Sequence, residues 1–141
     1  MDVKEARGHL ELAKEQWDKA SVAWWTPADP ATCVSNAFYA YENLIVAVAE
    51  ARGLEWEKNH FKKAGLATAL FNDKILSIDV GNTILRLNNL RKDVSYGEPG
   101  DELAGADLES IVSDLETFIE EVEGIVEAVE EEADEEEAED A

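Results

Sequence analysis

The sequence predicts an all-α protein. Apolar residues recur at the three- and four-residue spacing of helices in five segments, and no segment alternates between apolar and polar residues as a half-buried strand does. We expect an antiparallel bundle of four long helices and one short helix over residues 1–129, followed by an acidic disordered tail over residues 130–141. A chain of 141 residues is long enough to bury one such core.

The first two helices are predicted from apolar spacing and from the residues that flank them. An apolar or small residue stands at every third or fourth position of residues 2–25, and Pro27 then ends the pattern. Asp29 and Pro30 suit the N-cap and first turn of a second helix, which Gly53 ends. Both faces of this second helix carry apolar or small residues, so we expect it to be the central, most buried one.

Three further helices complete the expected bundle. A shorter helix is predicted over residues 59–70 and another over residues 79–92, after which glycines and a proline predict a loop reaching residue 105. The last helix begins near Asp107, and apolar residues recur in it every seven positions as far as Val129. The twelve residues that follow include nine acids, a composition typical of a solvated, frayed segment.

Charge is distributed unevenly along the chain. The formal net charge is −21, yet residues 52–92 carry eight bases against four acids. Residues 93–141 carry 21 acids and no base. So acidic a chain is expected to repel nucleic acid at long range, yet its one locally basic segment contains Arg91. Lysines on solvated helix faces are the simpler interpretation of that segment.

Several classes of protein are excluded or disfavoured by composition. No apolar run approaches the roughly 20 residues of a membrane span, so we expect no membrane association. The first residues lack a secretory signal pattern, and a single cysteine, Cys33, suits a reducing compartment, so we expect a cytoplasmic location. The spacing of Cys33, His9 and His60 fits no metal motif, and no glycine-rich phosphate loop is present. We predict neither a metal nor a cofactor.

The end of the fourth predicted helix is the candidate functional site. Arg91, Asp93 and Tyr96 stand within six residues where the apolar pattern ends, a spacing that directs Arg91 and Tyr96 into one groove. A salt bridge beside a packed tyrosine is the alternative explanation for these residues. The further basic candidates for contact with a phosphate are Lys92, Lys62, Lys63 and His60.

The order of four short segments provides a resemblance to a known family. The segments are Ser35-Asn36-Ala37-Phe38-Tyr39-Ala40-Tyr41, Ala51-Arg52-Gly53-Leu54-Glu55, Lys58-Asn59-His60 and Arg91-Lys92-Asp93-Val94-Ser95-Tyr96-Gly97. Over roughly residues 5–130 the chain resembles the HEPN family, small helical bundles with an aromatic-rich central helix. Near the end of a later helix, many members carry an arginine followed after four residues by Tyr-Gly.

The resemblance implies a homodimer in which the arginine motifs of two chains face each other. Active HEPN members are metal-independent ribonucleases of toxin–antitoxin and defence systems, in which the arginine holds the scissile phosphate and a histidine transfers protons. Other members accompany a nucleotidyltransferase or bind nucleotides or RNA. In this chain Tyr96 stands where the histidine is expected. A phenol with a pKa of about 10 is a poor base at neutral pH, whereas imidazole, with a pKa of about 6.5, is well suited.

Three hypotheses follow. The first is a non-catalytic or weakly catalytic HEPN-like interaction module that binds RNA, a nucleotide or a partner enzyme through a groove centred on Arg91, with Asp93 orienting Arg91 and Tyr96 lining the groove. The second is a metal-independent ribonuclease that uses Arg91 with Tyr96 or His60 as catalytic residues. The third is an acidic helical protein, such as an antitoxin, that docks a partner protein through its last helix.

Overall fold

The computed structural model describes residues 1–25 and 28–140. Their elements, in chain order, are α1 (Val3–Trp25), α2 (Pro30–Arg52), α3 (His60–Asn72), α4 (Gly81–Lys92), β1 (Val94–Ser95), β2 (Glu98–Pro99), α5 (Asp101–Ala104) and α6 (Leu108–Asp140). The predicted all-α class is confirmed. The described residues add one short helix, α5, and one hairpin of two-residue strands where the sequence predicts only a loop.

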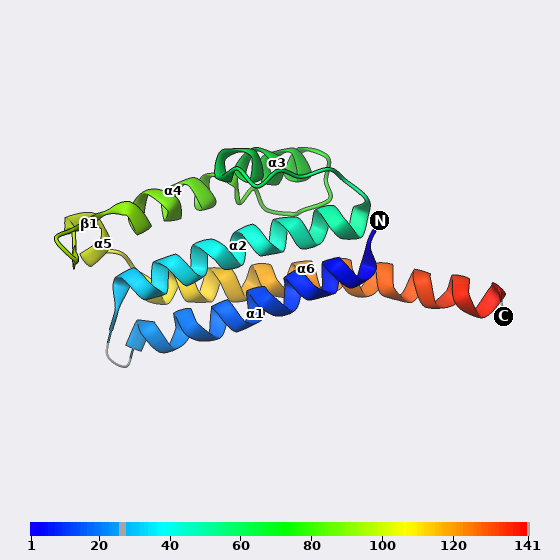
Figure 1. The fold of residues 1–141 in the computed structure, drawn as a ribbon, viewed down its shortest axis with the longest axis horizontal. Coiled ribbons are helices and arrows are strands. Elements are labelled where there is room, and N and C mark those ends of the chain that lie inside the picture. The colour runs from blue at the N-terminus through cyan, green and yellow to red at the C-terminus, as the bar shows by residue number, and fades with distance from the viewer. Residues whose placement is uncertain (26–27, 141) are drawn as a thin grey trace.

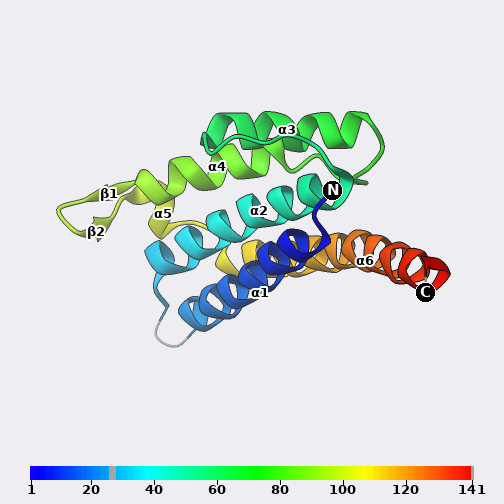
Figure 2. The ribbon, with the colours of Figure 1, turned by 45° about the vertical axis from the view of Figure 1, so that its right-hand side comes forward.

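Helix α2 lies at the centre of the molecule. Helices α1 and α6 pack along one side of it, and α3 and α4 lie along the other (Figure 1; the view in Figure 2 agrees). The predicted central position of α2 is confirmed, because fourteen of its residues are buried, far more than in α3 or α4. A side chain on α2 can therefore contact either layer, depending on the face from which it projects.

The long helices alternate in direction along the chain. Helix α1 runs opposite to both of its neighbours, but α2 and α6 run in the same direction, as the colours of Figure 1 show. An antiparallel bundle of four long helices is predicted, and the consecutive long helices α1, α2, α4 and α6 do alternate in direction, so α2 and α6, two apart in this order, are parallel. The reason is that α3, α4 and the hairpin return the chain to the end of the bundle at which α2 begins, and α6 starts from there.

The ends of α2 and α3 are determined by capping residues next to them. The carboxylate of Asp29 caps α2 by accepting hydrogen bonds from the backbone N–H of Thr32, at 3.2 Å, and from its hydroxyl. Gly53 ends α2 in the left-handed conformation, with φ of 68°. Asn59 caps α3 by accepting hydrogen bonds from two backbone N–H groups. Pro27, predicted to separate the first two helices, lies outside the described residues.

The core is formed mainly by α1, α2 and α6. Phe38 of α2 and Phe118 of α6 are its largest fully buried side chains. Cys33 is also fully buried, and desolvation by burial raises the pKa of its thiol to about 11. The thiolate is the reactive form of cysteine, so Cys33 is a small packing residue.

Residues 130–140 differ from the prediction of a disordered tail. They continue α6, which projects beyond the bundle at its C-terminal end (Figure 1). Glutamate and alanine are good helix formers and no glycine or proline follows Gly124, so nothing in this segment interrupts the helix. Val129 is the last buried residue of α6.

Candidate functional site

The guanidinium group of Arg91 lies at the C-terminal end of α4, against aromatic side chains of α2. Its central carbon is 4.8 Å from the ring centroid of Phe38 and 5.6 Å from that of Tyr39. Nε and Nη2 both donate hydrogen bonds to Oδ1 of Asn88, at 3.1 and 2.8 Å. None of the ion pairs among the described residues involves Arg91. Its charge is therefore available to a ligand.

Phe38 connects Arg91 to His60, the first residue of α3. The imidazole of His60 packs edge-on against the Phe38 ring, with the two centroids 5.1 Å apart. The Arg91 carbon and the His60 ring are thus no further apart than the sum of their two distances to Phe38. Two predicted site residues that lie 31 positions apart in the chain therefore pack against one aromatic ring.

Glu42 holds His60 in place. Its Oε2 is 2.6 Å from Nδ1 of His60, and its side chain is 5% exposed against 39% for His60. Oε1 of Glu42 lies 3.8 Å from Nζ of Lys63. Nδ1 is the only nitrogen of His60 that forms a hydrogen bond within the described residues. An imidazole oriented by a carboxylate through one nitrogen, with the other nitrogen open, is the arrangement that proton transfer requires.

Lys63 is placed differently from the prediction of a phosphate contact. Its side chain is only 14% exposed, and its ammonium group lies between Glu42 and the Trp56 ring, 5.7 Å from the ring centroid. The carboxylate of Glu42 offsets its charge, so Lys63 serves to hold α3 against α2.

Asp93 bonds to the backbone of the following segment. Its carboxylate accepts a hydrogen bond from the N–H of Leu103, at 3.0 Å, and its carbonyl accepts one from Gly100. The expected role of orienting Arg91 belongs instead to Asn88. The reason is that the chain leaves the helix at Asp93, which turns that side chain toward α5.

Tyr96 lies at the tip of the hairpin formed by β1 and β2. Tyr96 and Gly97 both have positive φ, 55° and 82°, between the paired residues Ser95 and Glu98. This is the geometry of a two-residue turn whose backbone twist suits a hairpin. The Tyr96 side chain is fully exposed, so within one chain it does not line a groove with Arg91 as expected.

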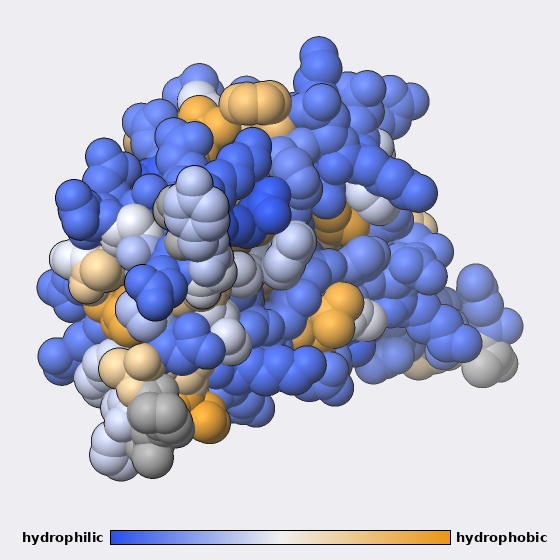
Figure 3. Space-filling model, turned by 60° about the vertical axis from the view of Figure 1, so that its left-hand side comes forward, coloured by the Kyte–Doolittle hydropathy of each residue, from blue (hydrophilic) through white to orange (hydrophobic). Residues whose placement is uncertain are grey.

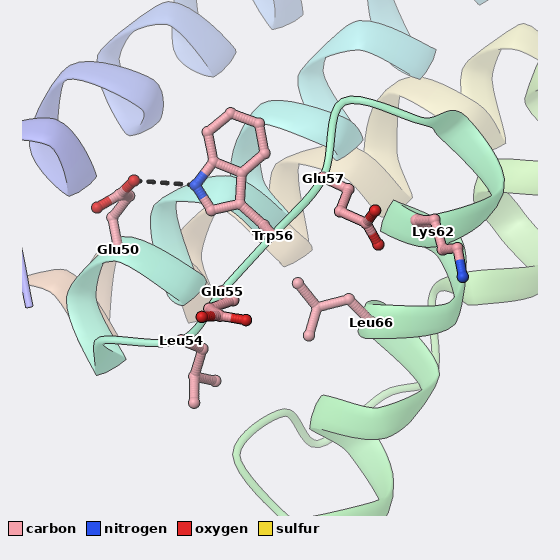
Figure 4. Close-up of a pocket in the computed structure, with 7 residues that line it drawn as sticks. All are labelled: Glu50, Leu54, Glu55, Trp56, Glu57, Lys62 and Leu66. Carbon is pink, nitrogen blue, oxygen red and sulfur yellow. Dashed lines mark hydrogen bonds between the residues drawn. The ribbon is translucent and has the colours of Figure 1, made fainter.

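The remaining two predicted lysines, Lys92 and Lys62, lie in different surroundings. Lys92 is exposed at the last position of α4. Lys62 stands at the rim of a separate cleft of about 700 Å³, shown in Figure 4. Three glutamates, Glu50, Glu55 and Glu57, share this cleft, and Glu50 accepts a hydrogen bond from the Trp56 indole. A cleft with three carboxylates and one ammonium does not favour a phosphate.

The surface at the hairpin end of the bundle is largely hydrophilic. Figure 3 shows hydrophobic residues there as separate spots among polar ones, without one broad apolar patch. Exposed apolar or aromatic side chains at this end include Val94 and Tyr96 of the hairpin segment and Tyr39 of α2. Recognition at this end would therefore depend on charge and on single aromatic side chains.

Three residues of the site, Phe38, Glu42 and Asn88, are not predicted as site residues by the sequence. Phe38 belongs to one of the four family-like segments, but nothing in its spacing indicates a contact with Arg91. A signal for the other two is present, because Glu42 and Asn88 each fall on the buried face of an amphipathic helix, where a polar residue requires a partner. They are the two buried polar side chains of the described residues.

The described residues contain no cluster of side chains suited to hold a metal ion, and none of their helices is long and apolar enough to cross a membrane. No protein-family model matches the chain, and no curated protein matches it in sequence. The geometry around Arg91 is therefore the evidence on which a function can be argued.

Proposed function

We propose that this protein is a HEPN-like interaction module that binds an RNA or nucleotide phosphate through Arg91. The observation that carries the proposal is that the guanidinium group of Arg91 is held in place without a carboxylate partner among the described residues. It is held by a neutral amide, packs on Phe38 and has no carboxylate partner among the described residues, in a chain with a net charge of −21. An arginine that is partly buried, held in one orientation and without a carboxylate partner is well suited to bind an external anion.

The immediate surroundings favour one phosphate group rather than a polyphosphate. Glu42 offsets Lys63, and Lys62 shares its cleft with three carboxylates, whereas Lys92 is exposed to solvent. Arg91 is therefore the partly buried cation of this group that has no ion pair among the described residues. Tyr39, 40% exposed beside Arg91, offers a ring on which a base can stack. A single nucleotide or one phosphodiester of single-stranded RNA fits this combination.

The resemblance to HEPN proteins extends the proposal to assembly. A homodimer would place the Arg91 sites of two chains face to face, and the exposed hairpin with Tyr96 would then complete the groove of the other chain. A partner nucleotidyltransferase, or the toxin or antitoxin partner of a defence system, is the kind of protein with which such a module would act.

The test compares Arg91→Ala with Arg86→Ala in the full chain. A fluorescently labelled oligouridylate is the probe, and anisotropy measures its binding at fixed salt. Loss of one charge-assisted contact should weaken binding about tenfold or more in Arg91→Ala. Arg86 is an exposed arginine on the same helix and serves as the control for charge, so its loss should have little effect. Equal loss in the two variants would contradict an Arg91-centred site.

A second candidate function, a metal-independent ribonuclease, is favoured by one observation. His60 has one nitrogen bonded to a buried carboxylate and packs against the same Phe38 ring as Arg91, whereas Tyr96 is fully exposed at the hairpin tip. If the protein cleaves RNA, His60 is therefore the better proton-transfer residue. Cleavage of labelled RNA that persists in EDTA and disappears in both His60→Ala and Arg91→Ala would favour this function over simple binding.

The acidic, projecting end of α6 supports the third hypothesis. Its surface from residue 131 onward is rich in glutamate and lies beyond the packed bundle, so a basic partner could reach it. A monomer by light scattering, together with loss of partner binding on truncation after residue 130, would favour a docking protein. A homodimer that binds oligouridylate through Arg91 would favour the first proposal.

A further inference from the structure

Asn88 is one of the two polar side chains buried among the described residues, with an exposed fraction of 3%. A buried amide is costly unless its polar atoms find partners. Its Oδ1 accepts two hydrogen bonds from Arg91, at 3.1 Å from Nε and 2.8 Å from Nη2. The two residues are three positions apart on α4, so they project from nearly the same face of the helix.

The two hydrogen bonds determine the orientation of the guanidinium group. Nε and Nη2 point toward one acceptor atom, which fixes the plane of the group, and the Phe38 ring limits its movement. Arginine has five N–H donors, of which two are used here. Both hydrogens of Nη1 and one of Nη2 are left for a ligand.

The acceptor is neutral, and this distinguishes Arg91 from Arg7 and Lys63. Arg7 is bonded to three carboxylates, and Lys63 is paired with Glu42. A carboxylate at position 88 would hold Arg91 equally well but would offset its charge. The amide oxygen of Asn88 accepts the same two hydrogen bonds without offsetting the charge of Arg91.

We propose that Asn88 is the positioning residue of the Arg91 site, which holds the guanidinium group in one orientation while leaving its charge available to a single oxyanion. This inference rests on the proposed function, because it requires Arg91 to bind an anion. Asn88 would thus act without contacting the ligand itself. It would fix the orientation of the Arg91 guanidinium group and leave the positive charge of that group unneutralised.

The experiment uses three variants of the full chain and the oligouridylate probe. N88D is nearly isosteric and keeps an acceptor for Arg91, but it adds a negative charge. N89D adds the same charge at the neighbouring exposed position and is the matched control. N88A removes the acceptor without changing the charge. Affinity is measured over a range of salt concentrations, and thermal unfolding checks that each variant folds.

N88D should keep the wild-type melting temperature and weaken binding about tenfold or more, and N89D should weaken it far less. In a plot of log affinity against log salt concentration, the slope should become shallower by about 0.7 in N88D, as in Arg91→Ala. Each phosphate contact with a single strand contributes about that amount to the slope. N88A should weaken binding but keep the slope. A residue with a merely structural role would not change the slope in this selective way.

Two results would overturn the proposal, and they are separable. If Arg91→Ala leaves binding unchanged, the proposed function itself fails. If Arg91→Ala weakens binding but N88D behaves like N89D, the Arg91 site stands and the role of Asn88 is refuted. If N88A does not fold, the comparison of N88D with N89D still decides the question.

Discussion

Glu42 is the residue on which the packing of α3 against α2 depends most directly. Its two carboxylate oxygens face His60 and Lys63, and its side chain is 5% exposed. A buried carboxylate with such partners is costly to remove, because the remaining charge of Lys63 is left in a poorly solvated position. The same contact orients His60, so stability and site geometry depend on one side chain.

We expect Glu42→Ala to lower the free energy of unfolding by about 2–3 kcal/mol, measured by urea denaturation. Glu42→Gln should cost less, since an amide oxygen can still accept a hydrogen bond from His60. Glu50→Ala is the control, because within the described residues the Glu50 side chain accepts one hydrogen bond, from the Trp56 indole, and its loss should cost about 1 kcal/mol or less. A Glu42→Ala protein as stable as Glu50→Ala would show that the buried contacts contribute nothing.

Position 100 requires glycine because a side chain would not fit there, and not because the backbone adopts an unusual conformation. Its φ of −71° suits any residue, but a Cβ at this position would overlap Oδ1 of Asp93. The close approach allows the Asp93 carboxylate to reach the N–H of Leu103 and so hold the hairpin to α5.

Gly100→Ala should therefore destabilise the protein by about 1–3 kcal/mol through overpacking. In an Asp93→Ala background the clash is absent, so the same substitution should cost much less. Urea denaturation of the four proteins of this double-mutant cycle measures the coupling. Equal costs of Gly100→Ala in the two backgrounds would contradict the steric explanation.

At the scale of elements, α1 and the second half of α6 are joined by a cluster of charges. Arg7 bonds Glu11 on its own helix and Glu123 and Glu130 on α6, and Lys14 pairs with Glu123 at 2.7 Å. The hydrogen bond from Arg7 lowers the pKa of Glu130 below its usual value. Although burial opposes the shift, the hydrogen bonds from Lys14 and Arg7 also lower the pKa of Glu123.

The sign of the pH dependence follows from these lowered pKa values. The folded state favours the ionised carboxylates, so their contribution is complete above the usual glutamate pKa of 4.5 and is lost as the pH falls through the lower folded-state pKa. Arg7→Gln should lower the free energy of unfolding by about 1 kcal/mol near pH 7, because the groups are partly exposed and solvent weakens the attraction.

The difference between wild type and Arg7→Gln should shrink as the pH is lowered toward about 4, measured by urea denaturation at each pH. Lys19→Gln is the control, since Lys19 is exposed on α1 and forms no ion pair with the described residues. A difference that stays constant over this pH range would contradict the contribution of the α6 carboxylates.

For the whole molecule, the excess of 33 acids over 12 bases dominates the electrostatics. Most of these acids are exposed and repel one another, a repulsion that salt screens within a Debye length of about 10 Å at 0.1 M. The attractive pairs around Arg7 are partly buried and are screened less. Added salt should therefore stabilise the folded chain.

The melting temperature should rise as NaCl is increased from about 0.05 to 1 M, measured by circular dichroism. A variant with Glu131, Glu132, Glu135, Glu136 and Glu137 changed to glutamine should respond less, because it has fewer charges to screen. A melting temperature that falls with salt would show that attractive ion pairs outweigh the net repulsion.

Much of this architecture could be predicted from local patterns. The spacing of apolar residues located the long helices, and Asp29 and Gly53 marked the ends of α2, because capping depends on neighbouring residues alone. The basic segment and its final Arg91 are likewise visible in the sequence. The helical state of residues 130–140 was not predicted, because their acidic composition indicates a solvated tail whereas their helix propensity favours the continued helix.

The sequence by itself therefore determined the helical class, most helix boundaries and the candidate arginine. Only the tertiary structure decided that α6 packs against both α1 and α2, that Asn88 rather than Asp93 holds Arg91, and that Phe38 contacts both Arg91 and His60. Helix formation is set by residues a few positions apart, whereas the site depends on which faces of α2, α3 and α4 meet. Which faces meet depends on packing between segments distant in the chain, and local sequence patterns do not predict it.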